Sequence, residues 1–291
     1  MSGDWLEFRK YYAEGNAYVV VEAQPGAVAA ASWIADATLG LGGDGLIVVE
    51  GAPGEAMHHM RVFNADGSEA QWCGNGARAA AALIAERDDL REGDAVTITS
   101  GGGTAQHVLL DRETWTFRAE MPVPADPIVE VGERGRLVQT LIGAPHLVVF
   151  GPRPDGEQVD AAGAALCAAR PGGTNVMFAS RDDDGGLTVT PWERGVGPVL
   201  GGATGAAAAA IAAGQAPAGE PLVATSADRS VSATVRQPGG AIAVRWDGAE
   251  RLLEMTGGAR LVAIGEVAVE PHMPGAGWPD GGRMAGAPVT G

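Results

Sequence analysis

The sequence predicts an α+β protein made of two similar halves, each with several strands around one central helix. Three glycine-containing segments of the first half recur in the same order in the second half. The spacing between them is nearly constant, which indicates an internal duplication. The matched segments are 15–21 with 143–149, 42–48 with 172–178, and 73–86 with 202–213.

Length and composition narrow the class of protein. The chain has 291 residues, which is enough for two domains of ordinary size, and no apolar run long enough to span a membrane. Its net charge of −16 argues against nucleic acid or a membrane surface as a partner. Residues 1–5 do not resemble a signal peptide, and two cysteines make no disulfide framework, so we expect a cytoplasmic protein. A homodimer is left open.

The domain boundary is predicted at the Pro-rich segment 122–127, the clearest linker in the sequence. The first domain is expected to cover 1–124, with 258–270 returning to it, and the second to cover 125–257. Residues 271–291 are rich in glycine and proline and are expected to be irregular. The Ala-rich segment 24–35 is expected to be helical.

Cys73 follows a strand-like segment, 58–63, and a polar turn, 64–69, and it precedes a run of strong helix formers. We therefore expect its thiol at the N-terminus of a helix, where unpaired N–H groups favour negative charge and lower a thiol's pKa. The amides of residues 74–76 can hold a carboxylate. A basic thiol beside such a cradle suits removal of a proton next to a carboxylate.

The internal repeat places Gly202 opposite Cys73. The segment 201–205 is expected to open the second Ala-rich helix, as 73–76 opens the first. The two helix N-termini are expected to face each other across a cleft. The protein then has two helix-end sites but a single thiol.

The residues around Cys73 resemble the first signature of the diaminopimelate epimerase family, and the likeness extends along nearly the whole chain. It implies two pseudo-symmetric domains, each a β-barrel-like sheet around a central helix, with the active site between them. It also implies that neither pyridoxal phosphate nor a metal ion is needed. The matching segments are 64–70, 73–78, 145–146, 173–176, 193–197, Trp246 and 255–259.

The resemblance assigns roles to particular residues. In this family two cysteines act on opposite faces of an α-carbon; Cys73 matches the first, and Gly202 stands where the second is expected. Ala144 replaces a substrate-contacting Asn, and Pro198-Val199 replace a Glu-Thr pair. The candidate catalytic residues are Cys73, His146 and Glu193. The candidate substrate-binding residues are Asn16, Asn64, Gly74, Asn75, Asn175, Arg194, Gly202, Ala203 and Thr204.

Two of these assignments have plain alternatives. His146 either tunes Cys73 or supplies an acid, or else is an ordinary buried histidine. Arg194 can fork a carboxylate and Glu193 can bind an ammonium group, or the two form a surface ion pair.

Three functions are weighed. The first is an isomerase-family enzyme that uses Cys73 as a single base on an amino-acid-like substrate and catalyses isomerisation, elimination or rearrangement from one face. The second is true epimerisation with water or His146 as the second acid. The third is a non-catalytic amino-acid-binding protein, which an intact motif around Cys73 disfavours.

Overall fold

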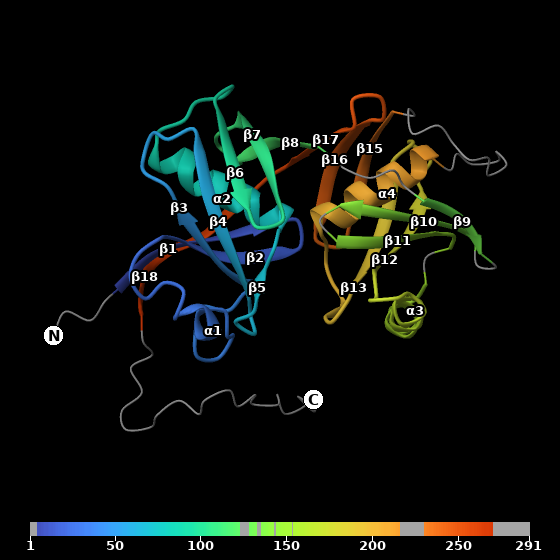
Figure 1. Cartoon of the computed structure of the whole chain (residues 1–291), viewed down its shortest axis with the longest axis horizontal. Helices are drawn as coiled ribbons and strands as arrows, with labels where there is room; N and C mark the ends of the chain where they lie inside the picture. Colours follow the sequence, from blue (N-terminus) through green and yellow to red (C-terminus); the bar gives the residue numbers. More distant parts are fainter. Residues whose placement is uncertain are drawn as a thin grey trace.

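The computed structural model describes residues 5–122, 128–132, 135–142, 144–152, 154–215 and 230–269. These residues form two lobes side by side, each with strands around one long helix (Figure 1). The predicted linker falls mostly on residues 123–127 and the tail on 271–291. Both lie outside the described residues, so the domain boundary stays a prediction.

The first lobe contains eleven elements of the described chain. They are β1 (Trp5–Ala13), β2 (Asn16–Glu22), α1 (Ala31–Ile34), β3 (Gly45–Glu50), β4 (Met57–Asn64), β5 (Glu69–Ala70), α2 (Gly74–Arg87), β6 (Ala95–Ser100), β7 (Gly103–Asp111), β8 (Thr116–Pro122) and β18 (Arg260–Ala268).

The second lobe contains another eleven. They are β9 (Ile128–Gly132), β10 (Gly135–Ile142), β11 (Ala144–Phe150), α3 (Gly156–Ala168), β12 (Asn175–Arg181), β13 (Leu187–Glu193), β14 (Gly197–Pro198), α4 (Ala203–Gln215), β15 (Val231–Gln237), β16 (Gly240–Asp247) and β17 (Leu252–Gly257).

The strand pairings repeat between the lobes. β2 runs parallel to β3 as β11 does to β12, and β4 runs parallel to β6 as β13 does to β15. Antiparallel pairs follow the same order, and β8 pairs with β17 to join the two sheets. β18 pairs with β1, so the end of the described chain returns to the first lobe. The predicted fold of two pseudo-symmetric halves is confirmed.

Each lobe is built around its Ala-rich helix. In α2, residues 74–85 are all buried, and α4 is buried in the same way from Ala206 to Ala213. A helix surrounded by strands has no solvent face, so it needs small apolar side chains on every side. Runs of alanine satisfy this requirement and also have the highest helix propensity.

The Ala-rich segment 24–35 differs from expectation, because only Ala31–Ile34 is an α-helix there. Gly26 has a φ of +85°, which a right-handed helix cannot contain. The residues before Ala31 form turns.

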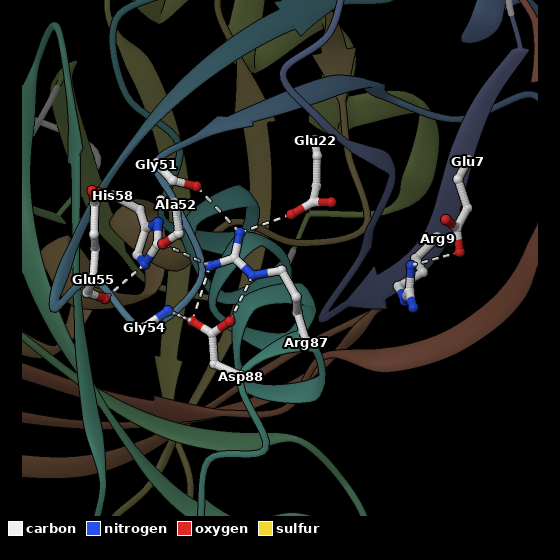
Figure 2. A network of polar contacts seen from close by, with 10 residues as sticks. All are labelled: Glu7, Arg9, Glu22, Gly51, Ala52, Gly54, Glu55, His58, Arg87 and Asp88. Carbon is white, nitrogen blue, oxygen red and sulfur yellow. Dashed lines mark hydrogen bonds and ion pairs between the residues drawn. The ribbon is translucent and has the colours of Figure 1, made fainter.

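The C-terminal end of α2 is held by a polar network around Arg87 (Figure 2). Its guanidinium donates to both carboxylate oxygens of Asp88, at 2.7 and 2.9 Å, and to Glu22 Oε1 at 2.7 Å. It also donates to the Gly51 carbonyl at 3.3 Å, while Asp88 accepts from the Gly54 amide at 3.1 Å. The network connects the β3–β4 loop to the C-terminal end of α2, which is the end away from Cys73.

Arg87→Met is expected to lower the free energy of unfolding by about 2 kcal/mol and the melting temperature by about 2–4 °C. Most of the loss comes from Asp88, whose side chain is only 5% exposed and would lose its cation. Glu22 is half exposed and contributes little. Thermal unfolding followed by circular dichroism measures the change.

The pH dependence identifies the group responsible. Hydrogen bonds from Arg87 lower the pKa of Asp88. A carboxyl with a lowered folded pKa stabilises the protein above its unfolded pKa, near 4, and loses this effect as the pH falls. The gap between wild type and variant should therefore be wide at pH 7 and narrow below pH ~4. Arg112→Met, which removes an exposed pair with Asp89, is the control and should change little. An equal gap at both pH values would exclude Asp88 as the cause.

Candidate functional site

The N-termini of the two central helices meet at the junction of the lobes. Cys73 is the N-cap residue of α2, as predicted. Gly202 holds the matching position before α4, where its carbonyl accepts the Ala206 amide. A Cβ atom placed on Gly74 would lie 3.0 Å from the Ala203 Cβ, so the first residues of the two helices almost touch. The N–H groups at the starts of two helices therefore converge on one place.

The thiol of Cys73 is bounded by Tyr18 and by its own helix. Its Sγ lies 3.0 Å from the Tyr18 hydroxyl and accepts the Gly76 amide at 3.3 Å. Burial raises the pKa of Cys73, and this outweighs the hydrogen bonds from Tyr18 and the α2 amides, which lower it. The expectation of a lowered thiol pKa is therefore wrong: the helix end is present, but the thiol is partly withdrawn from water.

A carboxyl group lies beside Gly202, the position at which the family resemblance leads us to expect a second thiol. A Cβ atom on Gly202 would lie 3.0 Å from Glu193 Oε1, so the carboxyl of Glu193 lies directly beside the missing side chain. Burial raises the pKa of Glu193, and the nearby Asp44 carboxylate raises it further. Glu193 thus keeps its proton to a higher pH than an exposed glutamic acid does.

A buried network supports the first turn of α2. The Asn75 amide donates to Asn16 Oδ1 at 2.8 Å and accepts from Arg78, whose guanidinium also pairs with Glu14. Glu14 accepts the Gly258 amide at 2.8 Å. The Arg78 side chain is fully buried, and the Glu14 carboxylate compensates its positive charge. Asn16 and Asn75 are therefore engaged with each other beside Cys73.

The β1–β2 turn of the first lobe packs against the segment of the second lobe that precedes α4. Gly15 has a φ of +104°, and a Cβ atom there would lie 2.5 Å from the Gly201 amide nitrogen. The Tyr12 hydroxyl donates to the Gly239 carbonyl at 2.7 Å. The Gly202 amide donates to Gln237 Oε1 at 2.9 Å. These contacts fix the loop that carries Gly202 against the first lobe.

The candidate residues of the second lobe meet at Asn175. Its amide nitrogen lies 3.4 Å from His146 Nε2, and its oxygen accepts the Arg194 backbone amide at 3.0 Å. Burial lowers the pKa of His146 to about 4, so this imidazole is neutral near pH 7. The exposed Arg194 side chain donates to the Gly172 carbonyl. Because His146 is neutral and buried, it is poorly suited to act as an acid. Its contact with Asn175 instead suits a role in holding that side chain in place.

The remaining candidates divide by exposure. Asn64 is exposed and donates to Ser68 Oγ at 3.0 Å. Ala203 and Thr204 form the start of α4, next to Gly202.

Among the described residues, no group of three or more His, Cys, Asp or Glu side chains could hold a metal ion. The described helices include none long and apolar enough to cross a membrane.

Sequence reasoning missed Tyr18 and the pairing of Arg78 with Glu14. Tyr18 lies in a segment that was expected to be an apolar strand. Its hydroxyl, a polar group in that segment, was the feature that could have marked it as a site residue. When the two halves are superimposed by their repeats, Tyr18 falls on His146, which was a candidate. Glu14 gave no such signal, because its contact with Arg78 joins residues 64 positions apart.

Two pseudo-symmetric lobes that join at paired helix N-termini define a known class of folds. A phenazine biosynthesis protein of the PhzF family from Bacillus anthracis has this fold, with a TM-score of 0.66 at 14% identity over 91% of this chain and 99% of its own. A hydroxyproline epimerase from Agrobacterium vitis, solved with bound trans-4-hydroxy-L-proline, has a TM-score of 0.60 at 17% identity, covering 91% and 92%.

Sequence similarity then gives the family. The profile described as diaminopimelate epimerase matches residues 8–121. The diaminopimelate epimerase of Desulforudis audaxviator is 34% identical over 288 residues, which cover 90% of this chain and 99% of that protein. The chain belongs to the diaminopimelate epimerase family and is an isomerase-type enzyme.

Proposed function

We propose that the protein is a cofactor-independent isomerase in which Cys73 is the single base and removes a proton from one face of a small amino-acid-like substrate. The reaction would be an isomerisation, elimination or rearrangement that begins with this deprotonation. The observation that carries the proposal is the asymmetry of the site: a thiol caps α2, and Gly202 stands before α4 with the Glu193 carboxyl beside it.

The substrate class follows from the groups around the thiol. The converging amides of α2 and α4 suit a substrate carboxylate, which would hold the α-carbon near Cys73 Sγ. The same amides stabilise the negative charge that develops on the carboxylate when the α-proton leaves. Arg194 would bind a second, distant carboxylate, if its guanidinium exchanges the Gly172 carbonyl for the substrate. The amino-acid epimerases of the same family and fold support an amino-acid-like ligand.

A second candidate is epimerisation with Glu193 as the acid on the opposite face. It is favoured by the raised pKa of Glu193 and by the position of its carboxyl beside Gly202. In this reaction Cys73 takes the α-proton, and the protonated Glu193 returns a different proton to the other face. The two candidates differ in the configuration of the product.

An exchange experiment in heavy water distinguishes them. The protein is incubated with one stereoisomer of diaminopimelate, the substrate named by its relatives, and both the α-deuterium content and the configuration are followed. We expect α-deuterium to enter with retention of configuration and inversion to be too slow for a working epimerase, because Gly202 carries no thiol. Cys73→Ala is the control and should abolish exchange.

Rapid inversion would contradict the one-faced reaction and support the second candidate. Absence of exchange from the wild type, together with tight binding of the same compound, would contradict both and favour a binding protein. A cytoplasmic location stays a prediction, and free Cys73 and Cys167 are compatible with it.

A further inference from the structure

Tyr18 places a polar hydroxyl group in the hydrophobic core of the first lobe. It lies on β2, its side chain is buried, and it belongs to the same hydrophobic core as α2. Its hydroxyl lies 3.0 Å from the Sγ atom of Cys73. A buried hydroxyl needs a hydrogen-bond partner, and here the thiol supplies it.

The position of Tyr18 in the fold is a matched one. Tyr18 pairs with Gly45 across β2 and β3, and His146 pairs with Asn175 across β11 and β12. Both pairings join a strand to the first residue of the next parallel strand. The repeat therefore places Tyr18 and His146 at equivalent points, one in each lobe. In the lobe that contains the thiol, this point is occupied by a phenol.

A phenol serves a thiol in both of its protonation states. The hydroxyl can accept a hydrogen bond from the neutral S–H group, and it can donate one to the thiolate. Burial raises the pKa of Tyr18 well above its ordinary value, so the hydroxyl keeps its proton while the thiol ionises. The direction of the hydrogen bond reverses when Cys73 loses its proton, and the phenol itself neither gains nor loses one.

The thiolate has few other sources of support. The amides of Asn75 and Gly76 face it from α2, and Glu193 faces it from β13 with a destabilising charge. Asp44, in the loop before β3, adds a further negative charge near Tyr18 and Glu193. Tyr18 is thus the side chain that lowers the cost of a negative charge on a desolvated sulfur atom.

We propose that Tyr18 is a positioning residue for Cys73, whose hydroxyl fixes the Sγ atom at the N-terminus of α2 and donates a hydrogen bond to the thiolate. Its role in turnover rests on the proposed function of Cys73 as a base. Its effect on the ionisation of the thiol does not, and it can be measured without a substrate.

The test is the rate of Cys73 alkylation by iodoacetamide as a function of pH, with the modified peptide identified by mass spectrometry. Tyr18→Phe keeps the ring and removes the hydroxyl. We expect the midpoint of the alkylation profile to rise by about one pH unit, and kcat/KM at pH 7 to fall about tenfold. The Michaelis constant should change less than kcat, because the hydroxyl acts on the thiol.

Tyr11→Phe is the matched control. Tyr11 is buried in the same hydrophobic core, on the neighbouring strand β1, and the substitution is the same. In Tyr11→Phe, the midpoint of Cys73 alkylation should equal that of the wild type. A monofluorinated tyrosine, which is a more acidic phenol, keeps the test valid if Tyr18→Phe does not fold. As a stronger donor to the thiolate it should lower the midpoint.

An alkylation midpoint that does not move in Tyr18→Phe, while the protein stays folded, would overturn the proposal. An unchanged midpoint with the fluorinated tyrosine would do the same. If the midpoint shifts as expected but Cys73→Ala keeps its turnover, the tyrosine–thiol interaction stands and the proposed function fails. The two ideas can therefore be rejected separately.

Discussion

Cys73→Ala is expected to reduce turnover roughly 10³-fold or more, because it removes the sole base of the proposed reaction. Folding should be nearly unaffected. The thiol is a weak acceptor for the Gly76 amide, at 3.3 Å, and its loss as a cap costs about 1 kcal/mol at most. Ligand binding measured by calorimetry should persist, since the proposed carboxylate cradle consists of backbone amides.

Cys73→Ser separates the shape of the side chain from its acidity. A hydroxyl is a far weaker acid than a thiol, and the helix N-terminus contributes on the order of 1 kcal/mol, or roughly one pKa unit. Serine should therefore fail almost as badly as alanine. If Cys73→Ala instead keeps most of its activity, the thiol is not the base.

The pH profile of the wild type gives an independent check. Because burial raises the pKa of Cys73, the thiolate forms only at higher pH than in an exposed cysteine. The base must be deprotonated to act, so the rate of α-proton exchange, which needs Cys73 but no acid, should rise with pH and its midpoint should lie above ~8.5. A midpoint in the acidic range would mean that the substrate-free site favours the thiolate more than its burial suggests.

The sequence predicted the parts of the structure that depend on local pattern. Glycines followed by helix formers identified the start of α2, and repeated spacing identified the second lobe. These signals are contained in short segments, and their physical basis is backbone conformation and helix propensity. The short helix α1 shows the limit of the same reasoning, since alanine content alone did not reveal the turn at Gly26.

The electrostatics of the site could not be predicted in this way. The pKa of Cys73 depends on how far the folded chain excludes water from the thiol and on the charge of the nearby Glu193. These quantities join residues far apart in the chain. The helix N-terminus was identified correctly and its amides do lower the pKa of the thiol, yet the net shift is upward, because desolvation by burial outweighs them.

The same limit applies to the opposite face. The sequence suggested that Glu193 binds a substrate ammonium group, and it identified Gly202 as the place of a missing thiol. It did not reveal that the carboxyl of Glu193 lies where a side chain at position 202 would begin. That contact turns two separate observations into a candidate pair of proton-transfer groups on opposite sides of one substrate, Cys73 and Glu193.

Glu193→Gln is expected to lower turnover about 100-fold, the usual cost of losing a positioned acid. Glutamine keeps the shape of the side chain but cannot deliver a proton. Folding should not suffer, since the carboxyl is desolvated and lies near the like charge of Asp44. Circular dichroism gives the stability, and substrate turnover gives the activity.

The configuration of the product shows which reaction Glu193 serves. In a one-faced reaction, Glu193→Gln should slow product formation while Cys73 still exchanges the α-proton with solvent. In an epimerase, the same variant should lose inversion and retain exchange of one stereoisomer. Loss of exchange together with turnover would contradict both and would make Glu193 a binding residue for the substrate.

Two neighbouring variants test the same carboxyl without changing it. Gly202→Ala adds a Cβ atom 3.0 Å from Oε1, so the Glu193 side chain must move and turnover should fall. Asp44→Asn removes a like charge and should lower the pKa of Glu193. An acid is active while protonated, so the ratio of turnover to α-proton exchange declines as the pH rises through the pKa of Glu193. In Asp44→Asn this decline should begin at lower pH, and a shift in the opposite direction would mean that the declining limb belongs to another group.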